Sequence, residues 1–250
     1  MNKQTLQQVI KQALKVDQPK WIERMATCAT IGIPSSSPIV QFLQEGAILA
    51  GGAVRDMECH PMGLIGALLA NTIRDFDLFF PSREKALDAA WRMVSAGNMG
   101  KRKEVYVHQS EFALTFIDVP LQTFPTNENE YCFPRDVQLI WRCSFEGTAD
   151  LLDQFDFTVT QFAMWMDEDG RIHIGYYDTA LEDAKFRRLV YTGRTECQFS
   201  TLHRTQKYFQ RGYKMKKRMM ASIVGDIMKK YNPDTVAENV EQDMYEDTID

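Results

Sequence analysis

The stretch ILAGGAVRDMECHPMGLIGALLANTIRDFDLFF, residues 48–80, decides the expected fold of this chain. Its first apolar run ends at the glycine pair Gly51-Gly52, as expected where a short buried strand turns into a helix. A second apolar run, RDFDLFF, predicts another buried strand. Between the two, GLIGALLANT predicts a core helix or a packing loop rather than a substrate contact. The stretch therefore predicts two strands separated by a glycine turn and a connection rich in apolar residues.

Two carboxylates, Asp75 and Asp77, stand two positions apart in the second predicted strand. Alternate side chains of a strand point to the same face, so these carboxylates are expected to lie side by side. Like charges this close repel each other unless a cation compensates them. Mg²⁺ prefers carboxylate oxygens together with substrate phosphates, and two such ions can serve a phosphoryl transfer. Asp75 and Asp77 therefore predict a site for Mg²⁺ or Mn²⁺.

The glycine pair predicts a phosphate site close by. Backbone N–H groups of Gly51 and Gly52 can approach an anion closely, and a helix N-terminus favours negative charge. Arg55 is near enough in sequence to add a charged donor to a phosphate. Asp56 is expected to orient Arg55 or to hold a ribose hydroxyl. Either motif alone is commonly a plain turn or a solvated strand end, and their combination is the specific signal for nucleotide binding.

LAGGAVRD together with RDFDLFF resembles the head-domain signature of the polymerase-beta-type nucleotidyltransferase superfamily. The resemblance is greatest to the branch of CCA-adding tRNA nucleotidyltransferases and bacterial poly(A) polymerases. It implies that Gly51 and Gly52 hold an incoming triphosphate, with Arg55 near the phosphates, and that Asp75 and Asp77 bind two catalytic metal ions. It also implies an α+β fold, a mixed sheet with flanking helices. The specific match covers residues 48–80, and a looser pattern continues to about residue 220.

The chain also departs from the CCA-adding branch. Eighteen residues separate Asp56 from Asp75, which is a longer connection than is usual in those enzymes. Later arginine-rich, nucleotide-selecting motifs are missing, and the chain is short for a complete CCA-adding enzyme. It more closely resembles the compact nucleotidyltransferase-like proteins of large viruses and phages. This resemblance implies a cytoplasmic location, which for a phage protein is the cytoplasm of the host. CCA addition itself is not expected.

The superfamily usually supplies a third acid from another strand, which takes the proton of the attacking hydroxyl. In RDVQLIWR the expected place holds Gln138, which cannot act as that base. Asp156 ranks first among the alternatives because it is embedded among aromatic residues, where burial perturbs a carboxyl pKa. Asp118 and Asp136 follow it. If none of them serves, the chain is expected to bind nucleotides without transferring them.

The rest of the sequence predicts an α+β core followed by helices. The predicted elements are amphipathic helices within 4–26, a helix at 38–45 capped by Ser37, a helix at 84–97 with Leu87, Ala90, Trp91 and Val94 on one face, strands within 103–119 and at DVQLIWR, and a hairpin at 157–177 turning near Asp169-Gly170. We expect a nucleotidyltransferase-like domain over 1–195, a basic helical segment over 196–232 and an acidic tail over 233–250.

HRTQKYFQRGYKMKKR, residues 203–218, mixes basic and aromatic residues. Arg204, Lys207, Arg211 and Lys214 are spaced three, four and three residues apart, which predicts one basic face of a helix. Such a face suits a phosphate backbone with stacked bases and indicates RNA as a partner. The alternative is a solvated basic face above an aromatic core stripe. The tail that follows carries acids and no basic residue, which predicts a loosely held or disordered segment.

Composition excludes several classes of protein. A formal net charge of −5 excludes a broadly basic nucleic-acid coat, and 44% hydrophobic residues suit a globular core. No apolar stretch is long enough for a membrane helix, and residues 1–16 lack the apolar core and cleavage site of a secretory signal, so secretion is not expected. The five cysteines form no CxxC pair, so neither a zinc site nor a disulfide framework is expected.

Two functions remain. The first is a metal-dependent nucleotidyltransferase that releases pyrophosphate and modifies an RNA 3′ end, another nucleotide or a protein hydroxyl. A toxin-like enzyme acting on tRNA or a host protein would share this chemistry. The second is a binding or regulatory module that keeps the fold without turnover. Gln138 favours the module, whereas paired carboxylates in an apolar strand favour the enzyme.

Overall fold

The computed structural model describes residues 19–95, 106–122, 132–142, 144–194 and 198–230. An eight-stranded sheet forms its centre, in the order β1-β8-β7-β2-β3-β6-β5-β4. Strands β3 and β6 are parallel, and the other neighbours in this sheet are antiparallel, so the sheet is mixed as predicted. Its strands are β1 Trp21–Ala26, β2 Ile48–Ala50, β3 Asp75–Phe79, β4 Val107–Gln109, β5 Ala113–Gln122, β6 Cys132–Ile140, β7 Phe162–Met166 and β8 Ile172–Tyr177.

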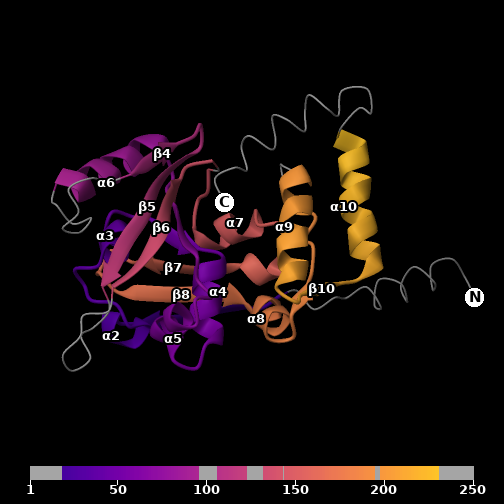
Figure 1. The fold of residues 1–250 in the computed structure, drawn as a ribbon, viewed down its shortest axis with the longest axis horizontal. Coiled ribbons are helices and arrows are strands. Elements are labelled where there is room, and N and C mark those ends of the chain that lie inside the picture. Colours follow the sequence, from indigo (N-terminus) through magenta and orange to yellow (C-terminus); the bar gives the residue numbers. More distant parts are fainter. Residues whose placement is uncertain (1–18, 96–105, 123–131, 143, 195–197, 231–250) are drawn as a thin grey trace, which may run out of the picture.

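Helices flank this sheet, and the last two stand together at one end of the molecule (Figure 1). No helix in the described ranges is long and apolar enough to cross a membrane. The helices are α2 Cys28–Ile31, α3 Pro38–Gln44, α4 Gly52–Cys59, α5 Gly63–Leu69, α6 Arg83–Ser95, α7 Thr148–Asp153, α8 Asp178–Lys185, α9 Gln198–Gln210 and α10 Lys217–Lys230, with a 3-10 turn η1 at Thr158–Thr160. Two short strands, β9 Arg188–Leu189 and β10 Lys214–Met215, form a separate parallel pair.

The main core lies between one face of the sheet and helices α3, α4, α5 and α6. Strand β3 contributes Phe76 and Leu78 to this core, and β6 contributes Val137 and Leu139. Because side chains alternate along a strand, Asp75 and Asp77 point to the opposite face, where they are partly exposed. Burial of the apolar residues of β3 thus presents both carboxylates on one surface.

A smaller apolar cluster, centred on Ile48, Ala50 and the leucines of α7, covers part of that opposite face. Phe79 and Phe155 pack against it, and their ring centroids lie 5.5 Å apart. The two carboxylates of β3 therefore share this face of the sheet with the aromatic pair Phe79 and Phe155, which we call the aromatic wall.

Several predicted elements are confirmed. The structure has strands at 48–50 and 75–79, a helix at 38–44 and a core helix, α5, in the connection after the glycine pair. The hairpin formed by β7 and β8 turns at Gly170, whose φ of 77° suits glycine. Helix α7 begins at Thr148, and Gly147 occupies its N-cap.

The expected helix over residues 4–26 is wrong for its last part. Residues 21–26 form β1, an edge strand whose register with β8 runs from Trp21 opposite Tyr177 to Ala26 opposite Ile172. This pairing joins segments about 150 residues apart, and such tertiary contacts override weak local periodicity. Residues 4–18 lie outside the described ranges.

The predicted buried face of the helix at 84–97 is also wrong in part. Its buried residues are Ala86, Ala89, Ala90 and Met93, whereas Trp91 is 72% exposed. Small alanines allow the helix to lie close to the sheet, so the largest apolar residue of this helix points outward. Large apolar residues on a surface are common enough that size alone does not identify an inward face.

His173 on β8 links the first strand to the hairpin. Its Nδ1 lies 2.9 Å from Glu23 on β1, and its Nε2 lies 2.8 Å from Asp167 after β7. The hydrogen bond to Asp167 and then the one to Glu23 raise the pKa of His173 above its ordinary value of 6.5, although partial burial opposes this. The protonated imidazole is therefore favoured in the folded protein.

We expect this contact to make stability depend on pH. Because the folded pKa is raised, the stabilisation is fully present below pH 6.5 and is lost as the pH rises through the folded pKa. Urea denaturation of the wild type and of His173→Gln between about pH 5 and pH 9 tests this expectation. The difference in free energy of unfolding should be largest at the acidic end and should shrink toward the basic end. A difference that stays constant with pH would contradict it.

Gly175 on β8 is required by close packing against tryptophan. A Cβ at this position would lie 2.4 Å from the Trp21 ring and 3.0 Å from the Trp165 ring. Gly175→Ala is expected to lower the free energy of unfolding by about 1–3 kcal/mol because the rings must shift. Gly225→Ala in α10 is the matched control, since nothing lies within 4 Å of its added Cβ. We expect the control to be neutral or slightly stabilising in urea denaturation, and equal losses in the two variants would contradict the packing argument.

Candidate nucleotide site

The glycine turn lies where β2 ends and α4 begins. Gly51 has φ 92° and ψ −142°, a conformation that L side chains rarely adopt. Its N–H donates a hydrogen bond to the Phe162 carbonyl on β7 at 2.8 Å, which fixes the turn to the sheet. Gly52 is the first residue of α4. The predicted change from strand to helix at the glycine pair is therefore confirmed.

Asp77 lies directly beside this turn. It is in register with Ala50, the last residue of β2, and a Cβ added to Gly51 would lie 3.7 Å from Asp77 Oδ2. Asp75 points to the same face one pleat away. The two predicted halves of the site, glycine pair and carboxylate pair, are thus brought together by the antiparallel pairing of β2 and β3.

The donor set suits a magnesium ion shared with a phosphate. Among the described residues, no group of three or more His, Cys, Asp or Glu side chains is arranged to hold a metal ion. Mg²⁺ is commonly held by one or two carboxylates, with substrate phosphates and water completing its shell. Asp75 and Asp77 are both partly exposed and lie beside the glycine turn, so they fit that requirement.

Strand β6 brings two further side chains to this face. Its parallel register places Asp136 opposite Asp75 and the buried Gln138 opposite Asp77. Asp136 Oδ1 accepts a hydrogen bond from the Asp118 N–H at 2.9 Å, where β5 is irregular and Asp118 has φ 55°. Asp136 is therefore the aspartate that the register places nearest to Asp75, on a strand about 5 Å away.

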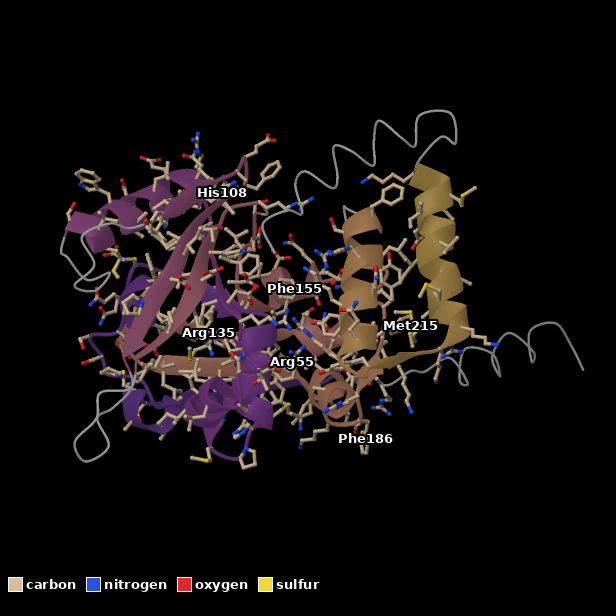
Figure 2. All side chains as sticks on the ribbon, in the orientation of Figure 1. Arg55, His108, Arg135, Phe155, Phe186 and Met215 are labelled. Carbon is tan, nitrogen blue, oxygen red and sulfur yellow. The ribbon has the colours of Figure 1, made fainter. Side chains whose placement is uncertain are left out.

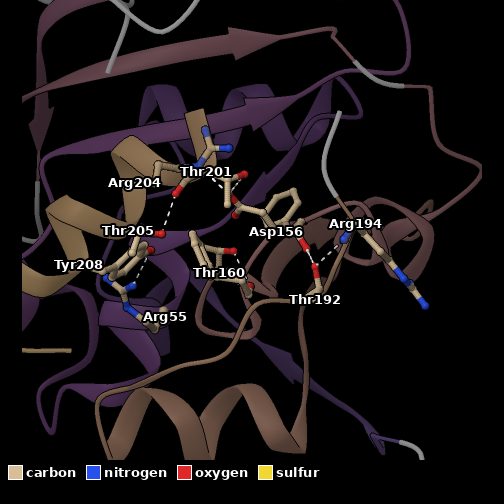
Figure 3. A network of polar contacts seen from close by, with 11 residues as sticks. Arg55, Asp156, Thr160, Thr192, Arg194, Thr201, Arg204, Thr205 and Tyr208 are labelled. Atoms are coloured by element: carbon tan, nitrogen blue, oxygen red, sulfur yellow. Dashed lines mark hydrogen bonds and ion pairs between the residues drawn. The ribbon is translucent and has the colours of Figure 1, made fainter. Parts of the chain in front are cut away.

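Asp156, ranked first as the third acid, is held by helix α9 instead. It is 6% exposed, and its Oδ2 accepts hydrogen bonds from the Thr201 hydroxyl at 3.0 Å and from Arg204 Nε at 2.9 Å (Figure 3). These contacts make Asp156 an anchor for α9. The register of β6 and the partners of Asp156 together shift our interpretation of the third acid to Asp136.

Arg55 lies at the junction between α4 and α9 (Figure 2) and is 4% exposed. Its Nε donates to Asp56 Oδ1 at 2.7 Å, and its Nη1 donates to the Tyr208 hydroxyl at 3.2 Å. Burial alone would lower the pKa of Arg55, but Tyr208, Asp56 and Tyr213 together raise it. Arg55 is therefore permanently charged, and its guanidinium is directed at protein groups behind the glycine turn.

Residues 3–187 match the family model described as Gabija anti-defense 2 family protein. This chain belongs to the Gabija anti-defense 2 family. The matched segment contains the whole of the site formed by β2, β3, α4 and β6, and it ends before α9. A search of curated proteins found no matching relative.

Solved structures of CCA-adding enzymes resemble this family member in fold. An apo form of a CCA-adding enzyme gives a TM-score of 0.52 at 12% identity, covering 84% of this chain and 47% of that one. A CCA-adding enzyme in complex with CTP gives 0.50 at 13% identity, with the same two coverages. The family member thus has the nucleotidyltransferase fold that its motifs implied, and it spans about half the length of these enzymes.

The expected basic face of one helix is wrong in this family member. Helix α9 ends at Gln210, Gly212 has φ 82°, and Lys214 lies in β10 opposite Arg188. Of the aromatic residues in the segment, Tyr208 is buried and Tyr213 is partly buried, and both pack with Phe157 and Leu189 in a third cluster, whereas Phe209 is exposed. Arg204 and Lys207 share α9, whereas Arg211 follows it with its guanidinium 5.8 Å from the Tyr208 ring centre.

Two residues near the site were not predicted from the sequence. Phe155 lies 4.0 Å from the position of a Cβ on Gly51, and Tyr208 contacts Arg55 from a point 153 residues further along the chain. The interleaved aromatic residues of 203–218 were a signal for Tyr208, but they indicated stacking on a partner as readily as burial. Nothing in the local sequence distinguished Phe155 from its aromatic neighbours.

Proposed function

We propose that this family member is a divalent-metal-dependent nucleotidyltransferase that transfers a nucleoside monophosphate from an NTP to an acceptor hydroxyl and releases pyrophosphate. The observation that carries the proposal is the position of Asp77 beside the Gly51 turn, with Asp75 on the same face. The fold, shared with CCA-adding enzymes, supports it. The structure of one such enzyme with CTP supports an NTP as the substrate.

The residues of the site divide the work in our proposal. The Gly52 N–H at the start of α4 binds the triphosphate, because a helix N-terminus favours an anion. Gly51 contributes by its missing side chain, since its own N–H is bonded to the Phe162 carbonyl. Asp75 and Asp77 hold Mg²⁺ or Mn²⁺, which when bound neutralises charge on the attacking and leaving oxygens. Asp136 accepts the proton of the acceptor hydroxyl as that oxygen attacks the α-phosphorus. Catalysis then comes mainly from orientation and charge compensation.

The family description supports a role against the Gabija defence, which would place the protein in the host cytoplasm. In our proposal the acceptor is a hydroxyl of an RNA 3′ end, of another nucleotide or of a protein that the defence depends on. The exposed basic residues Arg211 and Lys214 suit an RNA acceptor. A binding module without turnover is the second candidate, and the buried Gln138 opposite Asp77 favours it because a glutamine cannot replace a catalytic carboxylate.

The test follows α-phosphate label. The protein is incubated with Mg²⁺ or Mn²⁺, each α-labelled NTP in turn, and either total RNA or purified Gabija proteins, with Asp75→Ala/Asp77→Ala as the control. Label transfer with pyrophosphate release that the double variant loses supports the enzyme, and the labelled species identifies the acceptor. Metal-dependent NTP binding without transfer to any acceptor supports the binding module instead.

A further inference from the structure

We infer that helix α9 is part of the nucleotide site: through Tyr208 it fixes Arg55 behind the glycine turn, and through Arg204 it fixes Asp156 beside Phe155. Arg55 and Asp156 are then positioning residues rather than a phosphate ligand and a general base. This inference rests on the proposed function, because it assigns the control of the same glycine turn.

The first connection runs from the turn to Tyr208. The backbone N–H of Arg55 donates to the Gly51 carbonyl at 3.2 Å, so both residues belong to the first turn of α4. Arg55 Nη2 lies 3.6 Å from the position of a Cβ on Gly52, directly behind the glycine pair. The rings of Tyr208 and Tyr213 lie 5.7 and 5.8 Å from the guanidinium carbon. A shift of the turn would therefore separate a buried charge from its partners, which is costly.

The second connection runs from α9 to the aromatic wall. Asp156 follows Phe155, whose ring approaches both Phe79 and the Cβ position of Gly51. Thr192 holds the same two residues from the other side, since its hydroxyl donates to the Phe155 carbonyl at 2.7 Å and its N–H donates to the Asp156 carbonyl at 2.9 Å (Figure 3). Arg204 and Thr192 therefore hold Phe155 and Asp156 from opposite sides.

One face of α9 makes the contacts to Asp156 and Arg55. Thr201, Arg204, Thr205 and Tyr208 are spaced three, one and three residues apart, which places them on a single helical face. Thr201 and Thr205 are at most 1% exposed, so this face is buried although it is polar. A helix that only covered a core would turn apolar residues inward. On this face Thr201 and Arg204 bond Asp156 and Tyr208 bonds Arg55, whereas the Thr205 hydroxyl donates to the Thr201 carbonyl within the helix.

Tyr208→Phe tests the inference with a minimal change, since it removes the hydroxyl that accepts from Arg55 and keeps the buried ring. Tyr191→Phe is the matched control, because the Tyr191 hydroxyl donates to Asp226 on α10 at 3.3 Å within the same aromatic cluster. The probes are the Mg²⁺ complexes of the four α,β-methylene NTP analogues, titrated by calorimetry beside thermal melting. We expect Tyr208→Phe to weaken binding roughly five- to tenfold and Tyr191→Phe less than about twofold.

Each outcome decides a different point. If the wild type binds an analogue and Tyr208→Phe binds it equally well, the inference is overturned while the proposed function stands. Arg55→Lys keeps the positive charge but loses the planar guanidinium. If it also leaves analogue binding unchanged, the positioning role of Arg55 is refuted as well. If both tyrosine variants lower the melting temperature alike and only Tyr208→Phe loses affinity, the positioning role is supported. If the wild type binds none of the analogues, the proposed function fails and this inference fails with it.

Discussion

Asp77→Asn is expected to lower the rate of nucleotide transfer by about a thousandfold or more while the protein stays folded. Asparagine has the same shape as aspartate but no charge, so it should bind a divalent cation beside the glycine turn much more weakly. The loss of one of two neighbouring negative charges on β3 should leave stability unchanged or slightly higher. Single-turnover measurement with α-labelled NTP, together with a thermal melt, checks both parts of this expectation.

Parallel variants of Asp77, Asp136 and Asp88 separate loss of the metal site from loss of the general base. Asp136→Asn should lower transfer by about a hundredfold to ten-thousandfold, as removal of a general base does, while metal-dependent NTP binding persists. Asp88→Asn, which changes an exposed carboxylate on α6, should have no effect on either quantity. Full activity in Asp77→Asn would refute the metal site on β3. Full activity in Asp136→Asn would refute only its role as the base.

Gly51→Ala is expected to abolish NTP binding and to lower the free energy of unfolding by about 1–3 kcal/mol. The backbone of Gly51 has φ 92° and ψ −142°, and the added Cβ would occupy the space beside Asp77 Oδ2 where we place the triphosphate. Calorimetric titration with an α,β-methylene NTP and urea denaturation measure the two effects separately.

Gly52→Ala is the natural control for that change. Gly52 is the first residue of α4 and has no positive φ, and its added Cβ would make an ordinary 3.6 Å contact with Arg55. Replacement of a helical glycine by alanine at an unstrained position stabilises by about 0.4–1 kcal/mol. If Gly51→Ala proves as stable as Gly52→Ala and still binds nucleotide, the glycine turn is not the phosphate site.

Local sequence was sufficient for the elements of the site itself. The glycine pair marks where β2 turns into α4, and the alternation in DFDLF identifies which side chains of β3 leave the core. Both signals are carried by neighbouring residues, through backbone conformation and through the two-residue period of a strand. That is why the parts of the site built from residues 48–80 could be predicted without any tertiary contact.

The rest depended on contacts between distant segments. Asp136 takes its place opposite Asp75 only because β6 runs parallel to β3, and no local pattern gives that register. Asp156 stands among aromatic residues in the sequence, but its carboxylate is bonded to Thr201 and Arg204, which come from α9 more than 40 residues later. Likewise, the basic spacing of 204–214 did not reveal that Tyr208 would end up buried against Arg55.

The distance in sequence between Arg55 and Tyr208 has a consequence for protein synthesis. On the ribosome, α4 and the whole central sheet emerge before the segment that carries Tyr208 and Arg204. Until α9 has left the exit tunnel, the guanidinium of Arg55 lacks its tyrosine acceptor and Asp156 lacks its cation. Nascent chains that stall before α9, and fragments cut off there, would thus lack both contacts behind the proposed nucleotide site.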